Sequence, residues 1–118
     1  MLESIYAIQR PDWKTALEHA KGVYLITETS NGNRYVGSAY GVTGIWSRWA
    51  SYIYTGHGYT DELTKVITMH GIDYARQHFR FALLEQRTKK TDDLVVIERE
   101  TYWKNVLMTR APYGYNKN

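Results

Sequence analysis

The stretch GVYLITETSNGNRYVG, residues 22–37, predicts a β-hairpin. Strand-forming residues fill 23–27, and the run Ser-Asn-Gly-Asn at 30–33 has the composition of a tight turn. The return strand begins at 34–37. This hairpin decides the fold, and the other elements are predicted outward from it.

Helical patterns lie on both sides of the hairpin. Before it, residues 11–22 predict a helix that starts at a proline and ends at the cap residue Gly22. After it, helices are expected at 45–54 and 60–71, a third strand at 78–84, and a last helix from Thr91-Asp92-Asp93 to about Leu107. The order αββααβα predicts an α+β domain in which helices flank a small, three-stranded, mainly antiparallel sheet.

Composition narrows the class of protein. The 118 residues are 43% hydrophobic and contain no cysteine, which favours one core and excludes a disulfide scaffold, a thiolate nucleophile and a zinc finger. No apolar run approaches the roughly 18 residues of a membrane span, so we expect a cytoplasmic protein without a membrane partner. A net charge of +3 slightly favours polyanionic partners, and the 11 tyrosines are in excess.

The last predicted helix carries an acidic residue on its apolar side. On a helical wheel, Val96, Ile97, Trp103 and Leu107 fall within about 60 degrees of Glu100. A carboxylate that faces a core costs several kcal/mol unless it is paired or binds a metal. An ion pair with Lys104, one turn further, is the simplest explanation, and a functional carboxylate is the alternative that we favour.

The helix expected at 45–54 repeats this pattern with the opposite charge. Trp46 and Trp49 mark its buried side, and Arg48 and Tyr52 lie four residues apart on the shoulder of that side. The arginine stem can simply cover apolar surface. Together with an inward glutamate, it suggests a phosphate clamp beside a ligand for one divalent metal ion, as a phosphodiesterase requires.

These residues resemble the signature of the GIY-YIG nuclease superfamily, in particular its small prokaryotic and phage members. The tripeptides 22–24 and 35–37 match its two strands, Arg48 and Glu100 follow in order on later helices, and Gly114-Tyr115-Asn116 ends the pattern. The resemblance implies a catalytic domain at 22–118, preceded by a helical extension at 1–21.

The resemblance also implies roles for the residues. Tyr24 would act as general base or orient the attacking water, with its pKa depressed by a metal ion or Arg48, and Tyr35 would contact the phosphate or the nucleophile. Arg48 would stabilise the transition state, and Glu100 would hold one Mg²⁺ or Mn²⁺. Tyr52, Lys104 and Asn116 would contact phosphate or support the site, Asn116 by hydrogen bonding alone. The four histidines have no metal-ligand spacing and receive no role.

The function that we expect is metal-dependent endonuclease cleavage of double-stranded DNA. Two alternatives remain open: a non-catalytic DNA-binding or interaction module with the same fold, and a nuclease that cleaves RNA. Without the rest of the motif, Tyr24 and Tyr35 would be ordinary cross-strand aromatics, and Gly22 and Gly37 would only end their elements. Target recognition is expected to need a homodimer or an appended specificity domain, because a charge of +3 supports only weak backbone binding.

Overall fold

The computed structural model of the chain describes residues 19–40, 44–55 and 61–117. Over these residues the hairpin is followed by three helices, a third strand and a long last helix. The elements are β1 (Ala20–Glu28), β2 (Arg34–Ala39), α3 (Gly44–Thr55), α4 (Asp61–His70), α5 (Ile72–His78), β3 (Phe79–Thr88) and α6 (Asp93–Leu107). No helix in these three ranges is long and apolar enough to cross a membrane.

The sheet has the order β2-β1-β3, and both strand pairs are antiparallel. The central strand β1 pairs Tyr24 with Gly37 on one side and with Leu83 on the other. Its register against β3 shifts between Val23 and Tyr24, which marks a β-bulge. Gly22 precedes this bulge, and a Cβ there would lie 2.1 Å from the carbonyl oxygen of Glu85. Only glycine therefore fits this close approach of β1 to β3.

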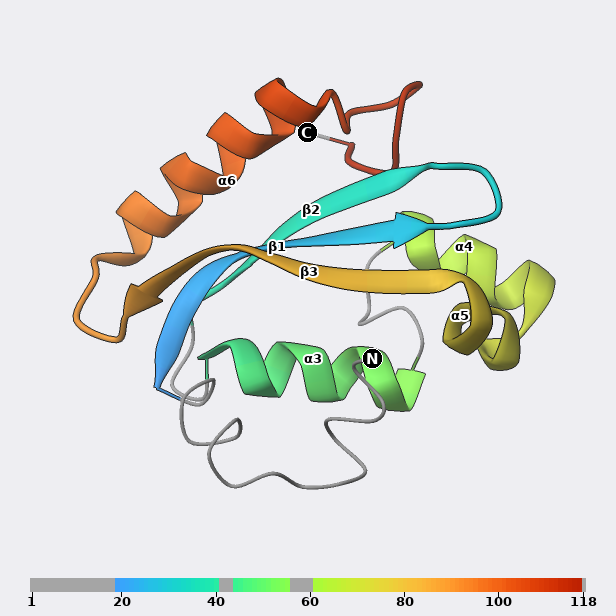
Figure 1. Ribbon diagram of the computed structural model, residues 1–118, viewed down its shortest axis with the longest axis horizontal. Coiled ribbons are helices and arrows are strands. Elements are labelled where there is room, and N and C mark those ends of the chain that lie inside the picture. Colours follow the sequence, from blue (N-terminus) through green and yellow to red (C-terminus); the bar gives the residue numbers. More distant parts are fainter. Residues whose placement is uncertain (1–18, 41–43, 56–60, 118) are drawn as a thin grey trace.

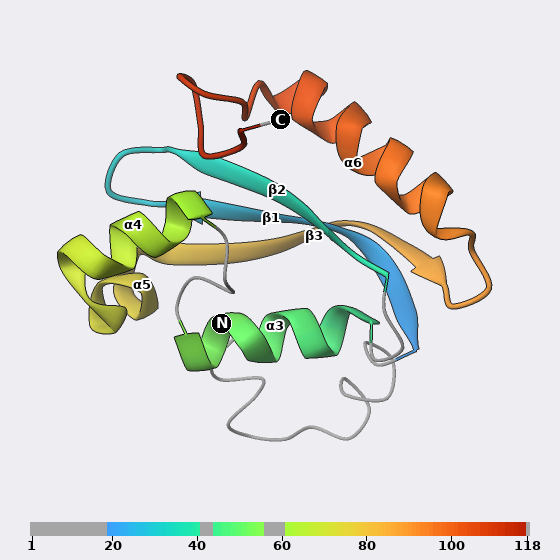
Figure 2. The same ribbon diagram turned by 180° about the vertical axis from the view of Figure 1, so that it is seen from behind.

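Helices cover both faces of the sheet. Figure 1, and Figure 2 from behind, show α3 on one face and α6 on the other, with α4 and α5 beside the end of the sheet. Alternate residues of β1 face the two sides, as the pleat requires. Tyr24 and Ile26 pack with Tyr52 of α3 and Leu63 of α4, whereas Val23 is buried on the α6 side, where Val96 of that helix is also buried.

The structure confirms the predicted α+β class and corrects several details. A short helix, α5, precedes β3 where the sequence analysis expected only the end of the preceding helix at Gly71. Gly71 ends α4 and, with φ of 86°, also begins α5. The expected helix cap at Gly22 is wrong, because β1 already begins at Ala20. The rest of the predicted first helix lies outside the described residues.

The last helix begins as predicted. The side chain of Asp92 caps it by accepting a hydrogen bond from the backbone N–H of Leu94, 2.8 Å away. Its inward face consists of positions 96, 99, 100, 103, 104 and 107, which are buried or half-buried. Ile97 does not belong to this face, because 38% of its surface is exposed. Glu100 does, and its side chain is 20% exposed.

Candidate active site

The hairpin brings the two predicted tripeptides together. Tyr24 is fully buried, and its ring lies against Gly37 on the paired strand. A Cβ on Gly37 would lie 2.4 Å from both Cζ and Oη of Tyr24, closer than any such contact allows. Gly37 therefore does not end an element but leaves space for the Tyr24 ring in mid-strand. The Tyr35 ring lies beside it, with centroids 6.5 Å apart.

Helix α3 adds a cation to this pair of phenols. Arg48 Nη2 donates hydrogen bonds to Tyr24 Oη at 3.2 Å and to Tyr52 Oη at 3.4 Å. The two hydroxyl oxygens are themselves 3.0 Å apart. The guanidinium carbon also lies 5.3 Å from the centroid of the Tyr52 ring, within cation–π range. Arg48, Tyr24 and Tyr52 thus form one hydrogen-bonded cluster, which we call the phenol cluster.

Burial has the largest effect on the pKa of Tyr24. It raises the pKa of Tyr24 well above the usual 10.0, and Tyr52 raises it further, while Arg48 lowers it by less. Burial alone would lower the pKa of Arg48, but the neighbouring Tyr24 and Tyr52 raise it more. The expected depression of the Tyr24 pKa by Arg48 is therefore wrong for the free chain: the phenol is neutral at pH 7 and the guanidinium is charged.

Helix α6 supplies the acidic group from the other side. Ser38 of β2 donates a hydrogen bond to Glu100 Oε1 at 2.5 Å, and Lys104 Nζ lies 2.7 Å from Glu100 Oε2. The ion pair that the sequence offered as the simple explanation is thus present. It does not lie on the solvent side of the helix, however, since the two side chains are only 12% and 20% exposed.

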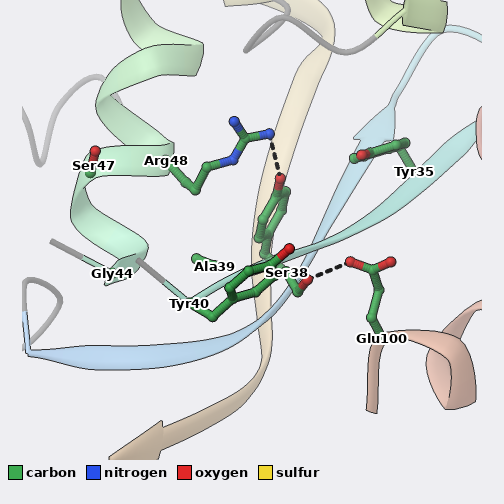
Figure 3. Close-up of a pocket in the computed structure, with 9 residues that line it drawn as sticks. Tyr35, Ser38, Ala39, Tyr40, Gly44, Ser47, Arg48 and Glu100 are labelled. Carbon is green, nitrogen blue, oxygen red and sulfur yellow. Dashed lines mark hydrogen bonds between the residues drawn. The ribbon is translucent and has the colours of Figure 1, made fainter. Parts of the chain in front are cut away.

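A pocket connects the phenol cluster with Ser38 and Glu100. It has a volume of about 370 Å³ and is lined by Tyr24, Tyr35, Ser38, Ala39, Tyr40, Gly44, Ser47, Arg48 and Glu100. Figure 3 shows Arg48 and Glu100 reaching it from α3 and α6 on opposite sides, with Ser38 hydrogen-bonded to Glu100. A cation, a carboxylate and neutral hydroxyl groups therefore converge on one polar pocket.

Solved structures with the same arrangement of elements identify the family. The catalytic domain of homing endonuclease I-TevI is 31% identical, with a TM-score of 0.57, over 83% of this chain and 98% of that domain. A second structure, the catalytic domain of intron endonuclease I-TevI with one glutamate mutated to alanine, is 27% identical, with a TM-score of 0.60, over 84% and 94%. The chain belongs to the GIY-YIG nuclease superfamily. No family model and no curated protein sequence matches this GIY-YIG chain.

Two oxygen-bearing side chains in the pocket of this GIY-YIG domain are of the kind that could hold a hard divalent cation. In the part of the chain that the structure describes, no three His, Asp or Glu side chains gather as a metal cage. Glu100 offers carboxylate oxygens to the pocket, and the Ser38 hydroxyl adds another oxygen beside them. Mg²⁺ commonly binds through one or two carboxylates and completes its shell with water and substrate phosphate.

The predicted site residues fall into two groups. Tyr24, Tyr35, Arg48 and Glu100 all line the pocket, whereas Tyr52, Lys104 and Asn116 do not. Tyr52 does not line the pocket, and its hydroxyl contacts Tyr24 and Arg48, which fits support of these two residues better than contact with a phosphate.

Asn116 pairs with an edge of the sheet. Its side-chain amide accepts from the backbone N–H of Val36 at 2.8 Å and donates to the Val36 carbonyl at 2.9 Å. Both backbone groups of Val36 are thereby satisfied, next to Tyr35 of the pocket. These hydrogen bonds hold the backbone beside Tyr35; that Asn116 supports the site in this way stays a prediction.

Three polar lining residues were not predicted: Ser38, Tyr40 and Ser47. Ser38 had no signal in the sequence, because the period of two in a strand places it on the face opposite to Tyr35, the predicted site residue of that strand. Ser47 directly precedes Arg48 on α3 and had no signal beyond that position. Trp46 and Trp49 belong to the core, as predicted.

Proposed function

We propose that the chain is a metal-dependent endonuclease that hydrolyses phosphodiester bonds of double-stranded DNA in one step. The observation that carries the proposal is the convergence of Arg48 and Glu100, from opposite sides, on one polar pocket that Tyr24 and Tyr35 also line. Both similar structures are catalytic domains of endonucleases, which supports the same reaction class here.

Arg48 is suited to bind the scissile phosphate. Its charge is fixed, and hydrogen bonds to Tyr24 and Tyr52 hold it in place before a substrate enters. A preorganised cation of this kind stabilises the additional negative charge of the transition state, at a typical value of about 3 kcal/mol for one donor. Arg48 therefore acts as the electrostatic group of the proposed reaction.

Tyr24 is suited to orient the attacking water as a neutral phenol. It accepts a hydrogen bond from Arg48, and its own proton can be directed at Tyr52 or at an oxygen in the pocket. Its raised pKa disfavours a phenolate in the free chain. Of the two roles that the family resemblance implied, the structure therefore supports the orienting one.

Glu100, with the Ser38 hydroxyl beside it, would hold one Mg²⁺ or Mn²⁺. The bound cation would supply Lewis-acid polarisation of the phosphate and stabilise the departing 3′ oxygen. The protein itself contributes the carboxylate, the serine that orients it and the arginine across the pocket.

Plasmid cleavage tests the proposal. Purified protein is incubated with supercoiled plasmid in Mg²⁺ or Mn²⁺, and nicked and linear products are measured over time. We expect nicked circles first, because such a pocket engages one phosphodiester at a time. Arg48→Ala and Glu100→Ala should each lower the initial rate by about 100-fold or more.

Matched variants control for nonspecific effects. Arg76→Ala removes an arginine from α5, and Glu98→Ala removes an exposed glutamate from the same helix as Glu100; both should cleave like the wild type. Cleavage that survives Arg48→Ala and Glu100→Ala would refute the site. DNA binding without cleavage would favour the non-catalytic module, and cleavage restricted to RNA would favour the RNA nuclease.

A further inference from the structure

Both carboxylate oxygens of Glu100 already have partners. Ser38 donates to Oε1 at 2.5 Å, and the Lys104 ammonium lies 2.7 Å from Oε2. The hydroxyl is neutral and can share its oxygen with a cation. The ammonium cannot, because it carries a positive charge at the position where a divalent cation would bind.

Glu100 and Lys104 form an ion pair but line different hollows. Glu100 lines the 370 Å³ pocket, but Lys104 does not. Lys104 instead lines a second hollow of about 250 Å³ together with Asn105, Met108, Arg110, Ala111 and Tyr113. Lys104 therefore borders open space that Glu100 does not line.

We propose that Lys104 is an internal counter-cation: it occupies the metal-binding oxygen of Glu100 in the free protein and thereby sets the affinity of the site for divalent cations. The inference rests on the proposed metal site at Glu100. In the free protein the pair neutralises a carboxylate that would otherwise be half-buried without a charge partner. An arriving divalent cation must break this pair or bind a few ångströms from a fixed positive charge, and either event weakens its binding.

Direct binding of Mn²⁺ tests this inference without any nucleic acid. Metal-stripped protein is titrated with Mn²⁺, and the free ion is measured from its electron paramagnetic resonance signal. Lys104→Met keeps the length of the side chain but removes the charge, and we expect it to bind Mn²⁺ about tenfold more tightly than the wild type. Lys104→Arg keeps the charge and should bind within about twofold of the wild type.

The chain offers a closely matched control. Lys21 also forms a 2.7 Å ion pair, with Asp93, and its side chain is 13% exposed against 12% for Lys104. Lys21 does not line the pocket. Its partner Asp93 is more exposed than Glu100, at 52% against 20%, so the match concerns the lysine alone. Lys21→Met removes the charge of an equally buried lysine outside the pocket and should leave Mn²⁺ affinity unchanged. Thermal melting gives a second readout: Mn²⁺ should raise the Tm of Lys104→Met more than that of the wild type.

Each outcome bears on the inference. Equal or weaker Mn²⁺ binding by Lys104→Met, absence of binding by every variant, or an equal gain in Lys21→Met would overturn it. Tighter binding that disappears in the double variant with Glu100→Gln would support it. Plasmid cleavage is measured separately, so a wild type that cleaves while Lys104→Met binds Mn²⁺ no more tightly refutes the counter-cation but not the nuclease.

Discussion

Two carboxylates on the inner side of α6 are buried to a similar extent but differ in the number of hydrogen-bond donors around them. Glu85 of β3 is 15% exposed and Glu100 of α6 is 20% exposed. Glu85 Oε1 receives hydrogen bonds from Arg99 and Trp103 of α6, and Oε2 receives bonds from Arg87. Glu100 has one serine and one lysine, and it faces the pocket.

The difference suggests that Glu85 has a structural role, whereas Glu100 can give up a partner to bind something else. The bonds to Glu85 fix the rotation of α6 about its axis, because Arg99 and Trp103 are one turn apart on that helix. The same rotation directs Glu100, next to Arg99, toward the pocket. Burial alone therefore does not distinguish the two roles, whereas the number of donors around each carboxylate does.

Replacing Glu100 should have the largest effect on activity and little effect on folding. We expect Glu100→Gln to lower the initial rate of plasmid nicking by about 100-fold or more, because the amide lacks the charge that would hold the proposed divalent cation. The amide can still accept from Ser38, and Glu100 loses one charged partner where Glu85 has two, so the Tm should fall by less than in Glu85→Gln. A Tm loss as large as the loss in Glu85→Gln would abolish the distinction between the two carboxylates.

Replacing Glu85 should give the reverse pattern. Glu85→Gln removes the charge partner of Arg99 and weakens the link from β3 to α6, which we expect to cost about 2 kcal/mol of unfolding free energy. Urea denaturation followed by circular dichroism measures this loss. In the folded variant, Mn²⁺ affinity should stay within about threefold of the wild type. Complete loss of Mn²⁺ binding together with native stability would contradict the assignment.

Acid should unfold the protein partly through the same carboxylate. Hydrogen bonds from Arg99 first, and then from Trp103 and Arg87, lower the pKa of Glu85 from 4.5 to about 2. A pKa that is lower in the folded state gives stability that is present above pH 4.5 and is lost as the pH falls toward 2. At pH 3 we expect Glu85 to have lost about 2 kcal/mol of its contribution.

Comparing the acid unfolding of the wild type with that of Glu85→Gln isolates the contribution of Glu85. Glu28, whose carboxylate accepts hydrogen bonds from Tyr74 and Tyr115, also has a lowered pKa and adds to the acid transition. Both proteins contain Glu28, so its contribution cancels when the stability of Glu85→Gln is subtracted from that of the wild type at each pH. A flat difference between pH 5 and pH 3 would show that Glu85 gains nothing from its partners.

Local patterns made much of this molecule predictable. The hairpin followed from strand formers on both sides of an Asn-Gly turn, and Glu100 followed from a carboxylate within a helical stripe. Arg48 was found in the same way, beside two core tryptophans. These features depend on residues that are close together in the chain, so they can be predicted from one sequence.

Features that depend on distant residues were not predictable. Ser38 meets Glu100 across 62 sequence positions, and the raised pKa of Tyr24 comes from burial by several elements. Helix α5 has only seven residues, too few for a clear helical period. Ile97 misled the prediction because both faces of α6 carry apolar residues: Leu94, Tyr102 and Val106 are also exposed.

Replacing Ser38 should have the smallest effect, and it tests the comparison most specifically. Its side chain donates a hydrogen bond to Glu100, whereas the bonds to Glu85 come from other residues. Ser38→Ala removes one hydrogen bond to a charged group, and we expect plasmid nicking to slow by about three- to tenfold, or roughly 1 kcal/mol. Without the serine, Glu100 keeps its ion pair with Lys104 but loses the hydrogen bond from β2. The carboxylate can then turn away from the pocket. Ser51→Ala, at a half-buried serine of α3, is the matched control. If Ser38→Ala slows nicking no more than Ser51→Ala does, the serine does not orient Glu100. The ability of Glu100 to accept a cation would then depend on Lys104 alone.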